Sequence, residues 1–362
     1  VEQLNKTALK AHGLDKNGHL YKVNNFDFHR YEDTIKLADD PDYNQANFEG
    51  MLEIKGDTDH TKLIEMLDAL NDESQKIDDV LDTYFDTENL VYWLAFQILT
   101  GNCDTQNRNC YLYSPLNSNT WFFLDWDNDG MLRKLELSLT GFSDYASWER
   151  GVSNYWGNVL FNRALRSKAF RGELDRAVKD LRSYMTEARL TKMIKHYREV
   201  TESLVFASPD IDNLPVTKDQ YEQIAASIPS EIEENYKSFR ESFKKPMPFY
   251  IGVPQIDNGK LRINWDASYD FEARDIRYTV ELARDYAISD VVFKAEDVLL
   301  PEVTCDAPDA GQYFVRVRAA NSDGFTQDAF DYYVTDDGKH YGMKCFYVQD
   351  GGKVVEDTYE EG

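Results

Sequence analysis

Hydrophobic and polar positions change their spacing several times along the first part of the chain. Short apolar runs at residues 18–23 and 48–56 are bounded by turn-forming residues, which predicts two short strands. Apolar positions then recur at helical spacing over residues 63–70. Asp57 or Thr58 can cap this helix, so we expect it to begin there.

A second helix is predicted between two typical end signals. Asp86 can cap its N-terminus, and Gly101 stands where a glycine usually ends a helix. The helix is apolar on most of its surface, so we expect it at the centre of a core. Residues 110–113 and 120–124 then form two aromatic strands joined by a turn, and such a hairpin brings the polar residues at its open end together.

The remaining chain changes from helical to strand spacing. Residues from about 155 to 245 are predicted to be helical almost throughout, and Pro246 and Pro248 lie in the linker that ends the helices. Alternation with period two begins at residue 249. The alternating segments are residues 260–265, 276–283, 312–320 and 329–334.

These segments predict a small all-β sandwich over residues 249–348. Trp265 on an early strand and Tyr313 on a later one fit an immunoglobulin-like sandwich, and the stretch resembles a fibronectin type III domain. Residues 349–362 are expected to be a frayed acidic tail. The fold class is therefore α+β, with residues 1–245 as a first domain.

Composition narrows the possible functions. The 362 residues suit two domains, and 42% hydrophobic and 14% aromatic content is enough for sizeable cores. No segment is long and apolar enough to insert in a membrane. The formal charge of −25 repels phosphate backbones, so we expect no nucleic-acid partner. The chain begins at Val1 without a leader sequence, so we expect a mature form or a fragment. We also expect a monomer.

The four cysteines do not form a zinc-binding pattern. Cys103 and Cys110 are close enough in sequence to be bridged in an oxidising compartment. Buried free thiols are the equally open alternative.

The strongest candidate for chemistry is the open end of the predicted hairpin. Asp104 is followed five residues later by Asn109, which is the D-x-x-x-x-N spacing of protein-kinase catalytic loops. Asp127 and Asp129 follow the second strand, where a metal-binding carboxylate would stand. Phosphoryl transfer needs positioning and cations more than covalent help, so carboxylate and amide oxygens on one hairpin favour it.

A second motif overlaps the first. Asp125, Asp127, Asp129, Gly130 and Glu136 match the calcium-binding EF-hand loop in full. An EF-hand loop follows a helix, whereas an aromatic strand is predicted here. The ninth loop position is occupied by the cationic Arg133, where an oxygen ligand or a bridging water normally stands. A solvated acidic turn without function is the remaining alternative.

The segment from residue 99 to residue 130 resembles the core of the CotH kinase family, the spore coat protein H-like atypical protein kinases. The resemblance includes the Asp loop ending in Asn, the tryptophan strand and the W-D-x-D motif, and extends more loosely over residues 1–245. Two positions differ from the family pattern, Cys110 in place of Tyr and Asp125 in place of Pro. Strands that cover the nucleotide in the family are expected to be missing, so the fragment could be inactive.

The resemblance implies roles for individual residues. Asp104 would be the catalytic carboxylate, and Asp127 the main metal ligand, assisted by Asn109 and Asp129. Lys22 would pair with the phosphates of ATP; its alternative is a surface lysine on an edge strand. The implied cofactors are ATP and Mg²⁺ or Mn²⁺, with Ca²⁺ possible at residues 125–136.

The resemblance also implies a substrate and a location. The activity would transfer the γ-phosphate of ATP to Ser or Thr of a protein on a bacterial spore coat or cell surface, or in the secreted fraction. The alternative is a secreted or surface binding module with an inactive kinase-like scaffold and a calcium-stabilised acidic loop.

Overall fold

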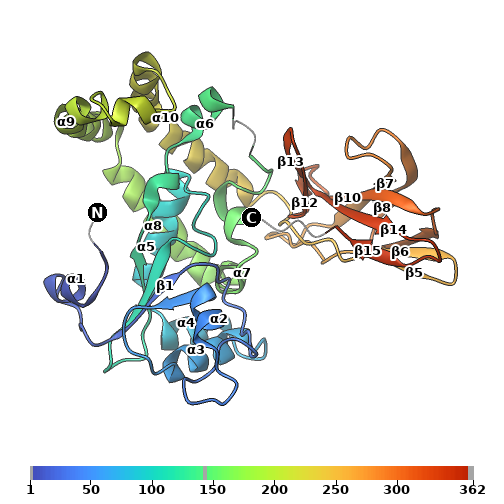
Figure 1. Ribbon diagram of the computed structural model, residues 1–362, viewed down its shortest axis with the longest axis horizontal. Coiled ribbons are helices and arrows are strands. Elements are labelled where there is room, and N and C mark those ends of the chain that lie inside the picture. Colours follow the sequence, from blue (N-terminus) through green and yellow to red (C-terminus); the bar gives the residue numbers. More distant parts are fainter. Residues whose placement is uncertain (1–2, 142–144, 358–362) are drawn as a thin grey trace. The chain divides into compact units, whose positions relative to one another are not determined.

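The computed structural model describes residues 3–141 and 145–357, and the chain divides into two compact units (Figure 1). The first unit comprises Val1–Asp144 and Arg150–Phe239, and the second comprises Tyr145–Glu149 and Arg240–Gly362. The first is a mixed α and β unit rich in helices, and the second consists mainly of antiparallel strands.

A four-stranded antiparallel sheet lies within the first unit. Its strand order is β2 (Leu52–Ile54), β1 (His19–Val23), β3 (Cys110–Ser114) and β4 (Phe122–Asp125). Every residue of β3 is buried, as expected for a strand that is covered on both faces. The predicted strand over residues 18–23 and the predicted aromatic hairpin are both confirmed.

Helices make up most of the rest of the first unit. They are α1 (Lys6–Ala11), α2 (Gln45–Met51), α3 (Thr61–Asn71), α4 (Ile77–Tyr84), α5 (Thr87–Thr100), α6 (Lys134–Thr140), α7 (Val159–Arg166), α8 (Lys168–Tyr184), α9 (Glu187–Val205) and α10 (Lys218–Ser242). Short 3-10 turns are η1 (Asn128–Gly130), η2 (Gly151–Tyr155) and η3 (Asp210–Asn213). The described helices include none that is long and apolar enough to cross a bilayer.

Helix α5 is central, as its apolar surface predicted. The Asp86 carboxylate accepts a hydrogen bond from the backbone N–H of Asn89 at 2.8 Å, which caps the helix at the predicted residue. Gly101 ends it with a φ of 64°. The ring of Trp93 stacks on that of Phe161, with centroids 5.9 Å apart, and α5 packs along α8 (Figure 1).

The expected strand over residues 48–56 is wrong in its first half. Asn44 caps a helix by accepting a hydrogen bond from the backbone N–H of Asn47 at 3.1 Å, and α2 continues to Met51. The strand proper covers only Leu52–Ile54. A local cap therefore overrode the apolar pattern.

Helix α3 begins at Thr61, later than the predicted start at Asp57 or Thr58. The Asp57 carboxylate accepts from the N–H of Asp59 at 2.8 Å, and Asp59 accepts from the N–H of Thr61 at 2.9 Å. These side chains form successive turns, which compete with the helix for the same backbone groups.

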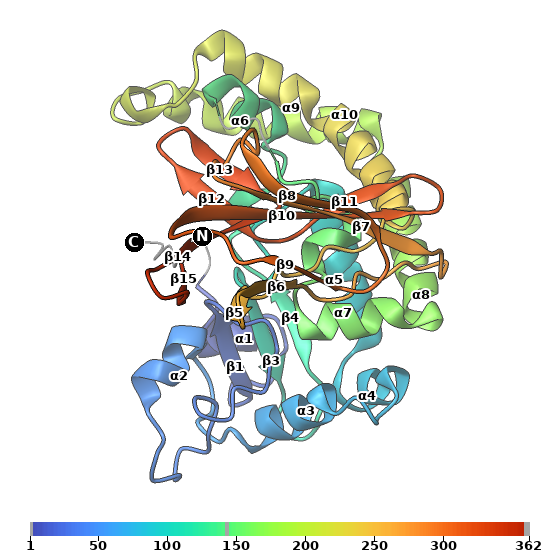
Figure 2. The ribbon, with the colours of Figure 1, turned by 90° about the vertical axis from the view of Figure 1, so that its right-hand side faces the viewer.

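The second unit contains two sheets that share one apolar core. One sheet has the order β5 (Gln255–Asp257), β6 (Lys260–Asn264), β9 (Glu302–Asp306). The other has the order β15 (Val354–Glu356), β14 (Met343–Val348), β10 (Gly311–Asn321), β7 (Ile276–Ala283), β8 (Val291–Val298), with β11 (Thr326–Asp328) also on β10 (Figure 2). Strands β12 (Tyr332–Thr335) and β13 (Gly338–Tyr341) form a separate pair. Trp265 and Tyr313 both lie in the core.

The expectation of a frayed tail is wrong for Val354–Glu356. These residues pair with β14, and the Lys344 ammonium lies 2.7 Å from the Glu356 carboxylate. Residues 358–362 of the expected tail lie outside the described residues.

Candidate active site

The β3–β4 hairpin brings the two halves of the predicted site together. Cys110 is paired with Asp125 at the open end, so the segments before β3 and after β4 meet there. The contact is close at Gly130, where a Cβ atom would lie 2.7 Å from Asn102 Oδ1 and 3.3 Å from Asp104 Cβ. The turn after β4 therefore packs directly on the loop that carries Asp104.

Asp104 and Asn109 are in direct contact. Asn109 Nδ2 donates to the Asp104 carboxylate at 2.7 Å and to its backbone oxygen at 3.1 Å. Asn109 has a left-handed φ of 58°, and its amide oxygen is the atom left to bind a cation. Burial raises the pKa of Asp104, while Arg108 and Asn109 act in the opposite direction. The charges of Asp129 and Asp127 also raise the pKa of Asp104, so the three carboxylates share one electrostatic field.

Asp127 and Asp129 are suited to binding a cation. Asp127 has a φ of 54° and is followed by η1, which contains Asp129; both residues are exposed. Neither carboxylate has a hydrogen-bond or ion-pair partner among residues 3–141 and 145–357. Across the same residues, no three His, Cys, Asp or Glu side chains are placed to hold a metal by themselves. A cation here would thus be shared with phosphate and water, as Mg²⁺ commonly is.

A network of amide side chains joins the two halves of the site. Gln97 Nε2 donates to the Asp125 carboxylate at 3.0 Å and to Asn128 Oδ1 at 3.2 Å. The Gln97 oxygen accepts from Asn102 Nδ2 at 2.9 Å, and Asn102 Oδ1 accepts from the N–H of Asp104 at 3.3 Å. Sequence reasoning missed this network, although a glutamine inside the apolar run of α5 was a usable signal.

Lys22 lies beside the same hairpin end. Strand β1 is flanked by β2 and β3, so the alternative of an edge-strand lysine is wrong. The Lys22 ammonium lies 5.9 Å from the ring centre of Trp126, which is between Asp125 and Asp127 in sequence. Lys22 is thus brought next to the W-D-x-D segment, by strand pairing that its position in the sequence did not reveal.

The acidic loop does not have the surroundings of an EF-hand. Strand β4 enters it, as predicted, where an EF-hand has a helix. Glu136 would be the bidentate calcium ligand, but both its carboxylate oxygens accept from Arg133, at 3.1 and 2.8 Å. The guanidinium therefore occupies the groups that calcium would need.

Cys103 and Cys110 are not joined by a disulfide in the structure, so the possible bridge between them is not formed. Cys110 is buried on β3, and burial raises the pKa of its thiol. A buried thiol of this kind is an inert packing group.

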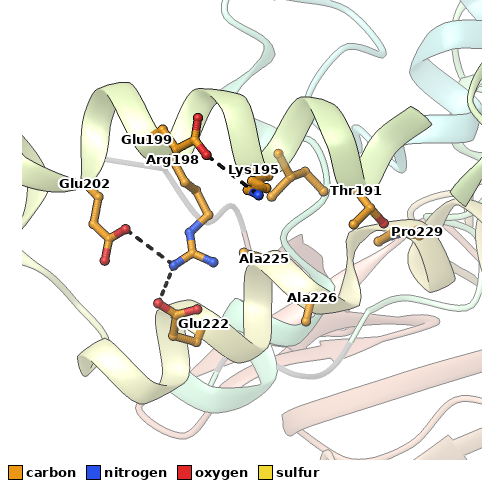
Figure 3. A pocket seen from close by; sticks show the side chains of 10 residues that line it. Thr191, Lys195, Arg198, Glu199, Glu202, Glu222, Ala225, Ala226 and Pro229 are labelled. Carbon is orange, nitrogen blue, oxygen red and sulfur yellow. Dashed lines mark hydrogen bonds and ion pairs between the residues drawn. The ribbon is translucent and has the colours of Figure 1, made fainter. Parts of the chain in front are cut away.

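A pocket of about 420 Å³ lies between α9 and α10 (Figure 3). Its lining includes none of the predicted site residues. Ile194, Ala225, Ala226 and Pro229 form its apolar wall. Arg198 lies between two glutamates, at 3.7 Å from Glu202 and paired also with Glu222. The pocket is lined by two cations and three carboxylates, and Lys218, outside the lining, lies 3.5 Å from Glu202.

Comparison with known proteins identifies one family. A family model described as CotH kinase protein matches residues 1–239. No curated protein matches the chain. Among solved structures, the chain is similar to the twitchin kinase region from C. elegans, with 19% identity and a TM-score of 0.20. That similarity covers 26% of this chain and 20% of the other, so the chain spans about a fifth of that structure's length.

Proposed function

The chain belongs to the CotH kinase protein family, and we propose that its first unit transfers the γ-phosphate of ATP to a Ser or Thr hydroxyl of a protein. The observation that carries the proposal is the contact between the Asp104 loop and the turn bearing Asp127 and Asp129. Phosphoryl transfer is catalysed mainly by positioning and by positive charge against the phosphates. At this hairpin end one carboxylate would position the hydroxyl as a base, and the other carboxylates would hold the cation that supplies the positive charge.

Asp104 would orient the acceptor hydroxyl and take its proton. A bond forms between the hydroxyl oxygen and the γ-phosphorus, and the bond from that phosphorus to the bridging oxygen of ADP breaks. The electron pair leaves with ADP. Because burial raises the pKa of Asp104, its carboxylate is a stronger base than an ordinary aspartate.

Asp127 and Asn109 would hold Mg²⁺ or Mn²⁺, with Asp129 assisting. The bound cation would neutralise charge on the β- and γ-phosphates, which the net charge of −25 otherwise repels. The donor set fits, because both carboxylates lack other partners in the described chain and Asn109 bonds to Asp104 through Nδ2, which leaves its Oδ1 as a cation ligand. Lys22 would contact a phosphate from the sheet side.

An Asp104→Asn variant tests the catalytic role. It removes the proton acceptor but keeps the size of the side chain, so transfer should fall by about 10²–10⁴-fold. The measurement is incorporation of radioactive γ-phosphate into the chain itself and into a Ser/Thr peptide library. Calorimetry with Mn²⁺ and ATP is the control, because binding should survive. Transfer at the wild-type rate would exclude Asp104 as the base.

For the second unit we propose a fibronectin type III-type module. Its first, second and fifth strands form one sheet and the third, fourth and sixth lie in the other, which is the arrangement of immunoglobulin-like sandwiches. The Tyr313 hydroxyl donates to the backbone oxygen of Asp309 at 3.0 Å, as in a tyrosine corner. A spacer or adhesion role fits such a module, on a spore coat, on a cell surface or in a secreted protein.

A further inference from the structure

Helix α10 contacts both sides of the candidate site through two buried residues on one face. Glu231 and Asn235 are four residues apart and are 4% and 3% exposed. We infer that these two side chains position the acidic turn relative to Asp104. The consequence for metal and nucleotide binding rests on the proposed function, whereas the anchoring itself does not.

The first anchor is the C-terminal end of α5, from which the Asp104 loop leaves. A helix leaves its last carbonyl oxygens without partners, and here three other segments supply donors. The bonds are Asn235 Nδ2 to Leu99 O at 3.1 Å, Leu132 N to Thr100 O at 2.9 Å and Arg150 Nη1 to Gly101 O at 2.9 Å. One helix end is thereby tied at once to α10, to the acidic segment and to the start of η2.

Gly101 makes this junction tight. A Cβ atom there would lie 2.5 Å from Arg150 Nη1 and 2.6 Å from Asn235 Nδ2, and its φ is 64°. Only glycine fits both the space and the backbone. The direction in which the chain continues towards Asp104 is therefore fixed by Arg150 and Asn235.

The second anchor is at the far side of the acidic turn. The backbone N–H of Lys134 donates to both carboxylate oxygens of Glu231, at 3.2 and 3.3 Å. Burial raises the pKa of Glu231, while this N–H and the charges of Arg150 and Lys134 oppose the shift. Lys134 follows Gly130 by four residues, so Glu231 fixes the chain just after the turn.

These anchors matter because Asp127 and Asp129 have no side-chain partner of their own in the described chain. Their placement depends on how the backbone of the turn is held, at Leu132 by α5 and at Lys134 by α10. Glu231 and Asn235 would not touch the cation. They are positioning residues, comparable to the outer groups that orient ligands in metal sites.

The test compares three changes on α10 by calorimetric titration of the full chain with ATP in Mn²⁺, well below the unfolding temperature. Glu231→Ala should weaken affinity by about 10–100-fold, the range for lost outer groups of metal sites. Glu231→Gln keeps one acceptor for the Lys134 N–H and should recover most of the loss. Glu234→Gln is the matched control, because Glu234 is half exposed and its one ion pair among the described residues is with the Lys134 ammonium.

Amide hydrogen exchange provides a readout that needs no ligand. In Glu231→Ala and in Asn235→Ala, exchange at the N–H groups of Leu132 and Lys134 should become faster, with little change in strand β3. Unchanged exchange and wild-type affinity in folded variants would overturn the inference. If the wild type binds no Mn²⁺ and ATP, the proposed function fails, and the exchange result alone then decides whether α10 holds the turn. If Glu231→Ala does not fold, Glu231→Gln and Asn235→Ala give the same two readouts.

Discussion

Replacing Gly130 with alanine inserts one methyl group between the two halves of the site. The new Cβ would lie 2.7 Å from Asn102 Oδ1, against ordinary contacts from 3.4 Å, and 3.3 Å from Asp104 Cβ. Gly130 does not have a positive φ, so the close approach and not the backbone conformation requires glycine. Asn102 cannot retreat easily, because it is 2% exposed and is held by Gln97 and Asn128.

The distance from the new Cβ to Asn102 Oδ1 is about 0.7 Å shorter than an ordinary contact, so the turn must move by a similar amount. Overpacking of this kind costs about 1–3 kcal/mol of unfolding free energy. Loss of the groups that orient metal ligands costs about 10–100-fold in metal affinity, so displacing the turn should raise the Kd for ATP with Mn²⁺ by about 10-fold or more.

Urea denaturation and calorimetric titration measure the two effects. Gly172→Ala is the matched control, because Gly172 is exposed in α8 and a Cβ there would meet no atom within 4 Å. That change should stabilise by up to about 1 kcal/mol through helix propensity and leave the Kd unchanged. Wild-type stability and affinity in Gly130→Ala would refute the claim that the halves are in close contact.

Other changes give further expected results. Arg108→Gln removes a cation 3.6 Å from the Asp104 carboxylate, so the pKa of Asp104 should rise and the acid limb of the pH–rate profile should move to higher pH. The shift should be small, since the side chains of Arg108 and Asp104 are 48% and 51% exposed. A shift to lower pH would contradict the assigned pairing. Lys22→Met should weaken ATP binding but not Mn²⁺ binding in calorimetry, and equal losses of both would exclude a phosphate contact. Tyr313→Phe loses the bond to Asp309 and should lower the unfolding free energy by about 0.5–1.5 kcal/mol in urea, whereas no change would show that the bond is energetically neutral.

Much of the fold followed from local signals in the sequence. Asp86 and Gly101 define α5 because capping and a left-handed end are decided by the residues at those positions. The hairpin of β3 and β4 followed from aromatic strands around a turn. Local competition explains the failures, since Asn44 capped a helix where residues 48–56 predicted a strand.

The candidate site was predictable in part for a physical reason. Asp104, Asn109, Asp127 and Asp129 lie on one hairpin, so short sequence separation was enough to bring them together. Glu231 and Asn235 lie about a hundred residues further along the chain, and only tertiary packing brings α10 to the end of α5. No spacing rule in the sequence contains that contact.

The most direct test of the central claim is calorimetric titration of the chain with ATP in Mg²⁺, Mn²⁺ or Ca²⁺, repeated with Asp127→Ala. We predict ATP binding that requires Mg²⁺ or Mn²⁺ and is lost in the variant, since the variant removes a carboxylate whose charge acts on Asp104. Calcium binding without nucleotide binding would contradict the account and favour a calcium-stabilised scaffold. Equal ATP binding by wild type and Asp127→Ala would contradict the assigned metal site.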